Sequence, residues 1–458
     1  MIEQLLKAHS TVNGWVWGPV TMILLMGTGL YLTILTRGVQ FRWLGKALGE
    51  VLGKVFTRTH AEGTVTPFQA VATALASTVG VGNIAGVSTA ITIGGPGALF
   101  WLIVSGLLGM GTKFAEVVLA ITYREQDDTG TFRGGAMYIL KNGLKAPWLG
   151  SLFALLTALA AFGIGNMVQA NSVAESVKAT FGVPAHVSGI VIVVLTGVVI
   201  LGGITRIADV TQLLVPFMCL SYLLGAAVIL VTHAERVPAV IETVFASAFT
   251  GHAAVGGFAG AGVMQALRFG VARGLFSNEA GLGSAPMVHA TARTDHPVRQ
   301  GLYGIFEVFV DTLLVCTSTG LVVLVTGEWS NGLTGAALAA RAFETGLPGV
   351  WGGVVVTTGI LTFAFSTLLG WSFYGETAIA YLLGTRVILP YRLAWLVAAY
   401  LGATGSLHVV WDVADTLNGL MALPNLVALL LLSPAVARSL RDFAEREAAR
   451  RGSGFSSP

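Results

Sequence analysis

The sequence predicts an all-α polytopic membrane protein, and three observations lead to this prediction. Charged residues make up only 11% of its 458 residues, against about 25% in a soluble domain. Apolar residues make up 54%. Eleven apolar stretches are long enough to cross a hydrocarbon core of about 30 Å, and they lie near residues 17–36, 67–91, 97–121, 150–170, 187–203, 210–232, 257–290, 301–326, 350–383, 393–411 and 413–433.

The same figures exclude other classes of protein. Low charge and high hydrophobicity exclude a disordered chain, and there are too few acids and bases to cover the surface of a soluble enzyme. Continuous apolar runs exclude a membrane β-barrel, whose strands read as short alternating segments. Cys219 and Cys316 both lie in apolar stretches, so we expect small buried side chains and no disulfide framework.

Lysine and arginine are distributed unevenly between the two sides of the predicted bundle. If the spans alternate in direction, 19 of the 26 basic residues fall in one set of loops and in the C-terminal segment, and 4 fall on the opposite side. Cytoplasmic segments have the excess of basic residues. The sequence therefore predicts an N-terminus outside the cell, a C-terminus in the cytoplasm, and a charged cytoplasmic tail at 434–458.

The second predicted span contains a run that resists a continuous helix. Gly80, Gly82 and Gly86 each lower helix stability by about 1 kcal/mol relative to alanine, and Thr78 and Asn83 add polar groups beside them. Unwound backbone at membrane depth exposes carbonyls that can bind a cation, and the N-terminal end of a half-helix suits a carboxylate. Close helix packing is the alternative explanation for the glycines, but it does not explain the polar groups.

The seventh predicted span contains a second such run, from Gly274 to Pro286. Its sequence, GLFSNEAGLGSAP, combines three glycines and a proline with polar side chains, among them Glu279. A carboxyl group at membrane depth needs a partner or a function. Irregular backbone is tolerated there only where protein or a water-filled cavity surrounds it, so this run is also a candidate site.

The two runs predict an internal repeat. They lie five spans apart, and each opens a block of five spans. An odd number of spans in a block means that the second block is inverted in the membrane, and a pair of interrupted spans in matching positions indicates a transporter site. The predicted divisions are an extra helix with its flanking segments (1–66), a first repeat (67–256), an inverted second repeat (257–433) and the tail.

Polar groups in two other spans are candidate ligands. Gln169 lies one helical turn after Asn166 in the fourth span. Its amide suits a zwitterion or, equally, a hydrogen bond between helices. In the ninth span, Thr362, Ser366 and Thr367 are spaced to share a face. Their hydroxyls can bind a small cation or bond to their own helix backbone.

Further candidates are an aromatic side chain and several charged groups. Trp371 lies one turn beyond Thr367 and either closes a pocket or packs at an interface. Arg273 and Glu279 are expected to form an ion pair or a gate. Lys113 and Glu116 are expected to pair locally.

Two further acids lie in the eighth span. Glu307 and Asp311 are one turn apart, and we expect them to form salt bridges or to relay protons.

A series of sequence blocks occurs in an order typical of one family. TPFQAVATALASTVGVGNIAGV is followed by GGPGALFW, then by KFAE, YRE and GGAMY, and later by ARGLFSNEAGLGSAP. These blocks resemble the alanine or glycine:cation symporter family, of the amino acid–polyamine–organocation superfamily, over about residues 65–411. One departure is Leu102-Ile103, where the family often has Met-Trp, and it lies away from the candidate site.

The resemblance implies a fold and a set of ligands. The fold would be similar to that of the bacterial leucine transporter, with two inverted five-helix repeats after one extra helix. Sodium would bind to the carbonyls of Ala76 and Val79 and to the hydroxyls of Ser366 and Thr367, and Thr367 could serve the ion, the substrate or both. The implied substrate site consists of Thr78, Gly80, Gly82, Asn83, Gln169, Phe276, Ser277, Thr367 and Trp371.

Sodium-coupled uptake of alanine and glycine by alternating access is therefore the leading hypothesis. A proton-coupled transporter of the same fold, with Glu279 as the proton carrier, is the alternative. No selectivity-filter sequence favours a channel, and no nucleophile–base or metal-ligand pattern favours an enzyme. Besides the amino acid and co-transported Na⁺, the expected surroundings are the lipid bilayer, with no cofactor, nucleic acid or obligate protein partner.

Overall fold

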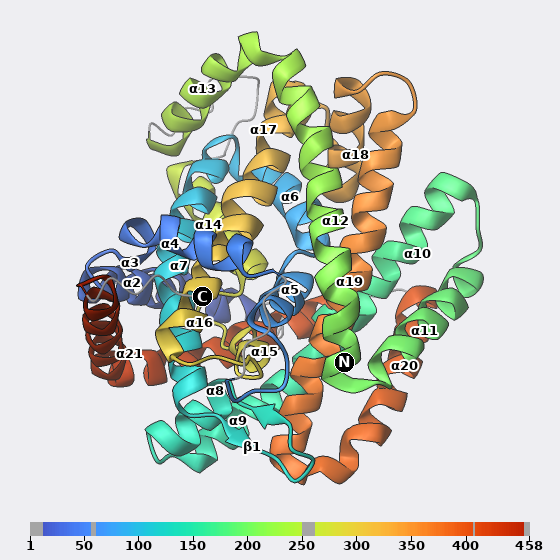
Figure 1. The fold of residues 1–458 in the computed structure, drawn as a ribbon. Coiled ribbons are helices and arrows are strands. Elements are labelled where there is room, and N and C mark those ends of the chain that lie inside the picture. Colours follow the sequence, from blue (N-terminus) through green and yellow to red (C-terminus); the bar gives the residue numbers. More distant parts are fainter. Residues whose placement is uncertain (1–11, 56–60, 250–261, 406–407, 453–458) are drawn as a thin grey trace.

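The computed structural model describes residues 12–55, 61–249, 262–405 and 408–452 (Figure 1). These residues are mostly helical, and two short strands, β1 (Glu125–Gln126) and β2 (Phe132–Arg133), form an antiparallel hairpin. The helices are α2 (Pro19–Leu35), α3 (Val39–Arg42), α4 (Leu44–Gly53), α5 (Pro67–Thr78), η1 (Val81–Asn83), α6 (Ala85–Gly94), α7 (Gly97–Thr122), α8 (Ala136–Tyr138), η2 (Ile139–Gly143), α9 (Pro147–Ala160), η3 (Ala161–Met167), α10 (Val168–Phe181), α11 (Ala185–Ile200), α12 (Gly203–Thr232), η4 (Ala234–Arg236), α13 (Val237–Phe249), α14 (Val263–Asn278), α15 (Pro286–His289), α16 (Pro297–Val308), η5 (Phe309–Cys316), α17 (Thr317–Val325), η6 (Glu328–Ser330), α18 (Gly335–Gly346), α19 (Trp351–Leu383), η7 (Thr385–Val387), α20 (Ile388–Thr404) and α21 (His408–Gly452).

The helical membrane architecture predicted from the sequence is confirmed. Within the described ranges, eight helices are long and apolar enough to cross a membrane, and a ninth span results if the bent pair of α5 and α6 counts as one. The fifth predicted span corresponds to the shorter apolar helix α11, and the seventh contains α14. The total of eleven spans and the inverted repeat stay predictions.

The second span breaks where the sequence predicts. Helix α5 begins with a capping box, in which the Thr66 hydroxyl accepts from the Gln69 amide and the Gln69 side chain accepts from the Thr66 amide. It ends at Thr78, and after the single turn η1 the chain continues as α6. The two parts of the span are bent by 61°.

The seventh span breaks later than predicted. Helix α14 continues through Gly274 to Asn278, because Gly274 serves close packing: a Cβ there would lie 2.1 Å from Ser105 Oγ. The backbone turns at Glu279, whose φ is +55°, and it runs irregularly through 280–285 to the short helix α15. Residues 257–261, the predicted start of this span, lie outside the described residues.

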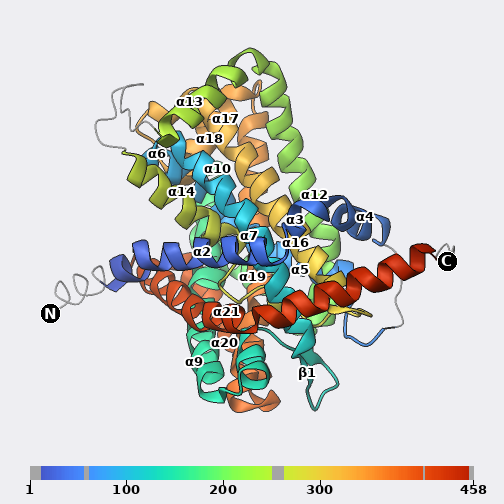
Figure 2. The same cartoon turned by 90° about the vertical axis from the view of Figure 1, so that its left-hand side faces the viewer.

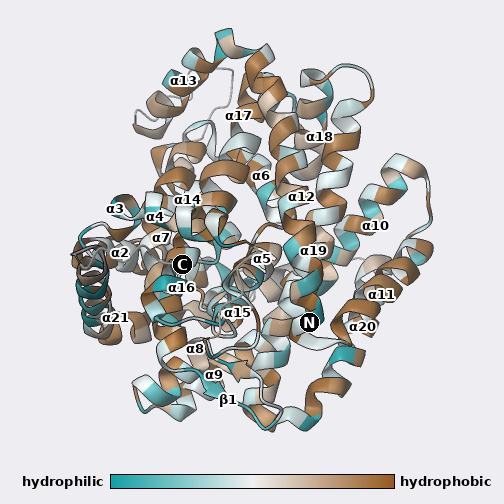
Figure 3. Cartoon of the chain, in the orientation of Figure 1, coloured by the Kyte–Doolittle hydropathy of each residue, from teal (hydrophilic) through white to brown (hydrophobic). Residues whose placement is uncertain are grey.

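The ninth and eleventh spans are continuous. The ninth predicted span is α19, a single unbroken helix of 33 residues. Helix α21 extends without interruption from the eleventh span into the predicted tail, and its far end is hydrophilic (Figure 3). It lies beside α2, and its end lies on the same side of the molecule as α3 and α4 (Figure 2).

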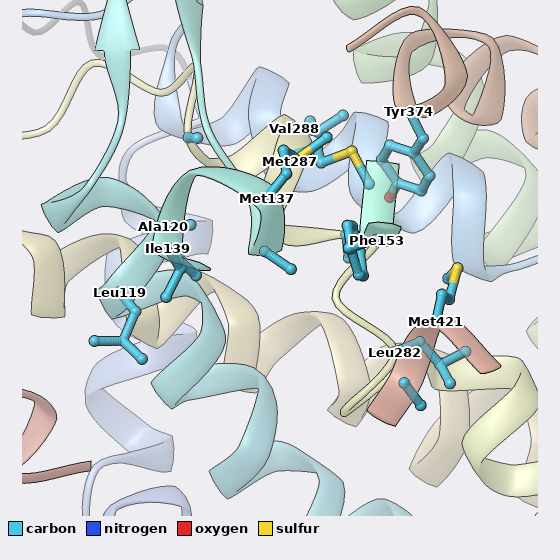
Figure 4. Close-up of a cluster of buried hydrophobic side chains, with 14 of the residues drawn as sticks. Leu119, Ala120, Met137, Ile139, Phe153, Leu282, Met287, Val288, Tyr374 and Met421 are labelled. Atoms are coloured by element: carbon cyan, nitrogen blue, oxygen red, sulfur yellow. The ribbon is translucent and has the colours of Figure 1, made fainter. Parts of the chain in front are cut away.

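The irregular segment of the seventh span is enclosed by protein. Residues 279–290 are all buried, and Leu282 lies in an apolar cluster with side chains of α7, α9, α15 and α21 (Figure 4). Both cysteines are free and buried, as expected. The fold therefore places irregular backbone at the centre of the bundle, where neighbouring helices can satisfy its polar groups.

Close contact between α7 and α14 should be sensitive to a single methyl group. A Cβ on Gly270 of α14 would lie 2.3 Å from the backbone oxygen of Ala98 in α7, so Gly270→Ala should force the helices apart at a cost of about 1–3 kcal/mol. We expect a lower Tm in detergent. Gly27→Ala is the matched control, because a Cβ there meets nothing within 4 Å, and it should leave Tm unchanged or raise it. Equal Tm values for the two variants would contradict the packing.

Candidate functional site

A small cavity lies where the two broken spans meet. Its volume is about 20 Å³, slightly above the roughly 10–15 Å³ that one water molecule needs. Nine of the site residues predicted from the sequence line it: Thr78, Gly80, Gly82, Gln169, Phe276, Ser277, Glu279, Thr367 and Trp371. Three further residues complete the wall: Ser77, Ile164 and Asn418.

The first break offers hydrogen-bond donors to this cavity. Val81 and Gly82 are the first residues of the turn η1, so their amides have no carbonyl of the same turn to donate to. Neither amide makes a hydrogen bond within the described part of the chain. Asn83 accepts from the Gly80 amide at 2.9 Å and fixes the turn. Gly80 allows close approach of α19, because a Cβ there would lie 2.8 Å from Thr367 Oγ1.

Two buried amide side chains offer acceptors to the same cavity. Gln169 is held by a 3.0 Å hydrogen bond from its Nε2 to the Ile164 carbonyl, and its Oε1 has no hydrogen-bond partner. Asn418 Oδ1, from α21, is also without one. Their exposed fractions are 5% and 1%. An unsatisfied buried acceptor costs about 1–3 kcal/mol, so both oxygens are suited to a ligand that brings donors.

The residues expected to hold sodium lie together beside the cavity. The hydroxyls of Ser366 and Thr367 lie 3.0 and 3.1 Å from the Ala76 carbonyl oxygen, and each also lies 2.9 Å from the Phe363 carbonyl oxygen of its own helix. Val79 is buried and has left the helical conformation, with ψ at 87°. Thr362, expected on the same face, instead donates to the Thr358 carbonyl of its own helix at 2.7 Å, which was the alternative considered for it.

Glu279 is bonded to the cavity wall. Its Oε1 accepts from Trp371 Nε1 at 2.9 Å, and its Oε2 accepts from Ser284 Oγ at 2.5 Å. The expected direct ion pair with Arg273 is not formed. The Arg273 guanidinium lies 5.7 Å from the centre of the Phe276 ring, because its helix turns it toward a neighbouring cleft of about 170 Å³. Phe276 lines both spaces, and a gating role for Arg273 stays a prediction.

Asn83 lies behind the cavity wall, because its side chain points to a carboxyl group of the eighth span. Asp311 accepts from Asn83 Nδ2 at 2.6 Å and from Ser277 Oγ at 2.9 Å. It also accepts from the Thr312 hydroxyl at 2.8 Å. One carboxyl group therefore joins the break of the second span to the end of α14. Among the described residues the expected salt bridge of Asp311 is not formed, and a role in relaying protons stays a prediction.

A second carboxyl group supports the break of the seventh span. Glu116 Oε1 accepts from the backbone amides of Gly281 and Gly283, each at 3.1 Å, and from Asn425 Nδ2 at 2.6 Å. The expected local pair of Glu116 with Lys113 is not formed. Glu116 therefore serves as an acceptor for amides that have left the helix.

Lys113 pairs instead with the eighth span. Its Nζ lies 3.2 Å from Glu307 Oε1, and His289 Nε2 lies 2.8 Å from Glu307 Oε2. Gln300 Nε2 lies 2.9 Å from His289 Nδ1. All four side chains are fully buried. This cluster ties α15, the helix after the second break, to α7 and α16, and it confirms the salt-bridge expectation for Glu307.

Sequence reasoning missed Asn418, Asp311 and Glu116 as site residues. Asn418 is a polar residue inside an apolar span, and this was a usable signal. Asp311 and Glu116 were noticed, but they were assigned to salt bridges. Their actual contacts are to backbone and side chains of the two breaks, which no local pattern predicts.

The buried cluster around Glu307 should be costly to disrupt on one side only. Lys113→Met removes the ammonium group and leaves a buried carboxylate without its main partner, which typically costs about 3–5 kcal/mol. We expect a large fall in Tm in detergent. The double variant Lys113→Met/Glu307→Gln removes both charges and should recover most of the loss. A double variant no more stable than the single one would contradict the pairing.

Comparison with known proteins identifies relatives over almost the whole chain. The model of the sodium:alanine symporter family matches residues 2–456. The sodium/alanine symporter AgcS of Methanococcus maripaludis is 48% identical over 95% of this chain and 96% of its own. The probable sodium/glutamine symporter GlnT of Bacillus subtilis is 36% identical, with 95% and 90% covered. The putative sodium/proton-dependent alanine carrier YrbD of Bacillus subtilis is 35% identical, with 95% and 91% covered.

A solved structure shows a similar fold. A manganese transporter of Eremococcus coleocola superposes with a TM-score of 0.50 at 16% identity, over 82% of this chain and 81% of its own. At that identity the likeness concerns the fold alone. Together with the family match, the apolar helices describe a multi-pass membrane transporter and not an enzyme, and the chain belongs to the sodium:alanine symporter family.

Proposed function

We propose that the protein is a secondary active transporter that takes up alanine and glycine together with sodium by alternating access. The cavity between the broken spans is the observation that supports this most directly. Free amides of Val81 and Gly82 suit a carboxylate, and the unpartnered oxygens of Gln169 and Asn418 suit an ammonium group. A free amino acid has both groups, one at each end of its backbone.

The proposed sodium site lies between the first break and α19. Carbonyls released from a helix and hydroxyl groups are the ligands that transporters of this kind offer to sodium. Ala76, Val79, Ser366 and Thr367 provide both types. Sodium would replace the hydrogen bonds that the two hydroxyls now donate to Ala76. AgcS and GlnT are named as sodium symporters, which supports this choice of ion.

The proposed selectivity for small side chains rests on two rings. Trp371 is 1% exposed and held by Glu279, and Phe276 lies against Gly82, where a Cβ would be 3.5 Å from the ring. Together they leave little room beyond the amino acid backbone. Ser277, with its hydroxyl on Asp311, and Thr78 complete the proposed substrate contacts.

The proposed transport cycle uses the predicted topology. The extra first helix precedes two inverted repeats at 67–256 and 257–433, with the N-terminus outside and the tail in the cytoplasm. A membrane potential of −100 mV drives one positive charge inward by about 2.3 kcal/mol, and the sodium gradient adds to this. Coupling requires that sodium and amino acid favour the same state of the protein.

Proton coupling is a second candidate function, and the number of buried carboxyl groups supports it. Four carboxyl groups, on Glu116, Glu279, Glu307 and Asp311, are buried, and Lys113 forms an ion pair with one of them, Glu307. A proton on one of them would reduce the excess of negative charge. The printed name of YrbD includes both sodium and protons.

Uptake of labelled alanine into proteoliposomes tests the choice of ion. We expect accumulation with an inward sodium gradient and none with potassium at equal pH. Uptake that is equal in both salts and rises with an imposed proton gradient would support the proton-coupled candidate instead. Absence of alanine and glycine uptake under either gradient would contradict the proposed substrates.

Variants of the proposed sodium site should act on sodium affinity. Ser366→Ala combined with Thr367→Val removes two oxygen ligands. Hydrogen bonds to charged groups are worth about 1.5–3 kcal/mol each, so the loss of two ligands should raise the sodium concentration for half-maximal alanine uptake by on the order of 100-fold or more. Thr362→Val is the matched control, since among the described residues its hydroxyl bonds only to carbonyls of its own helix and not to the first break, and it should leave sodium dependence unchanged. Equal behaviour of both variants would exclude this site.

A variant of the ring wall should change substrate selection. Trp371→Ala should allow leucine uptake and raise the leucine-to-alanine uptake ratio by about tenfold or more, because one methylene group in a pocket already discriminates by roughly 10- to 200-fold. Trp371→Phe keeps most of the bulk but loses the hydrogen bond to Glu279, so it should retain the alanine preference. An unchanged ratio in Trp371→Ala would show that another side chain limits size.

A further inference from the structure

A second, larger cleft lies far from the transport cavity, between the end of α2, α3 and α21. Its volume is about 450 Å³. Three arginines, Arg37, Arg42 and Arg441, line it together with apolar side chains of Leu35, Val39 and Leu440. We call these six residues and the space between them the arginine cleft.

The arginines of the cleft have no acidic partner among the residues that the structure describes. No ion pair includes Arg37 or Arg42, and the one hydrogen bond of the Arg441 side chain is a 3.5 Å contact to the Ala437 carbonyl of its own helix. The neighbouring cations are different. Lys46 pairs with Glu447, and Arg299 lies 2.5 Å from Glu50 and 2.8 Å from Asp295. Three exposed arginines therefore line the cleft, and none of them is paired with an acid of the described residues.

The cleft lies at the edge of the bundle, beside the end of the first long apolar helix. Helix α2 ends at Leu35, two residues before Arg37, and Arg441 belongs to the charged end of α21. In Figure 1, α2, α3 and α21 form one lateral edge of the molecule, and Figure 2 shows α2 and α21 side by side with α3 near their common end. The cleft therefore lies next to the ends of the first and last predicted spans, on the side predicted to be cytoplasmic, where lipid headgroups are expected.

We propose that the arginine cleft binds an anionic phospholipid. Basic pockets between transmembrane helices on the cytoplasmic side are suited to anionic headgroups, and guanidinium groups bind phosphate through paired hydrogen bonds. The headgroup phosphate contacts Arg37, Arg42 and Arg441, and an acyl chain lies along Leu35, Val39 and Leu440. The lipid joins the first helix to the last, and it is independent of the transport site.

Native mass spectrometry of the full-length protein in neutral detergent tests this proposal. Phosphatidylglycerol and phosphatidylcholine are titrated separately, and inorganic phosphate and glycerol 3-phosphate are added in two further arms. The cleft variant is Arg37→Gln/Arg42→Gln/Arg441→Gln. The control variant is Arg206→Gln/Arg386→Gln/Arg438→Gln, which removes the same charge from exposed arginines outside the cleft on the same predicted side.

We expect phosphatidylglycerol to bind more tightly than phosphatidylcholine to the wild type and to the control variant. Each arginine near an anionic headgroup contributes about a fivefold gain, so the cleft variant should bind phosphatidylglycerol on the order of 100-fold more weakly. Its Tm in phosphatidylcholine, measured in parallel, should match that of the control. If the triple variant fails to fold, Arg37→Gln and Arg441→Gln are tested singly, each with an expected fivefold loss.

Three results would overturn the proposal. Equal loss of binding in the cleft and control variants would show a general charge effect. Equal affinity for the two lipids would show that the protein does not recognise the headgroup charge. Displacement of phosphatidylglycerol by millimolar inorganic phosphate or glycerol 3-phosphate would show a site for a free anion and not for a lipid.

Discussion

Backbone that leaves a helix inside a membrane has to find its hydrogen-bond partners within the protein or in a bound ligand, because hydrocarbon offers none. Carboxyl groups on neighbouring helices support both breaks here, while the amides of Val81 and Gly82 have no partner within the described residues. Glu116 accepts from two amides of the second break, and Asp311 accepts from side chains of both breaks. The position of Asp311 fixes the distance between the two broken spans, and with it the position of the cavity between them.

This solution has an electrostatic consequence. Carboxylates withdrawn from water cost several kcal/mol each unless they are paired, and the lysine at position 113 faces Glu307 on the eighth span. The acceptors of the two breaks therefore remain under-compensated when the site is closed. A proton on one of these carboxyl groups, or a cation bound close to them, would lower this cost.

Local composition was enough to locate the breaks and nearly all of the cavity wall, because glycine and polar residues are rare at membrane depth and stand out there. The contacts between spans were not accessible in the same way. Asn83 and Asp311 are 228 residues apart, and Lys113 has Glu116 on its own helix face but pairs with Glu307. Periodicity indicates which residues share a helix face, but it does not determine the rotation of that helix against its neighbours.

The small size of the cavity bears on how ion and substrate are coupled. About 20 Å³ holds one water but not an amino acid, so this arrangement has to widen before a substrate can bind. The larger the fraction of the protein in this narrow state, the lower the apparent affinity for the substrate. Thr367 is placed to connect the two events. Its hydroxyl bonds to the Ala76 carbonyl and also limits the space beside Gly80. If sodium takes the place of that hydrogen bond, the first break is released from α19 on the side where the substrate carboxylate would enter. Sodium and amino acid would then favour the same widened state, which is the condition for symport.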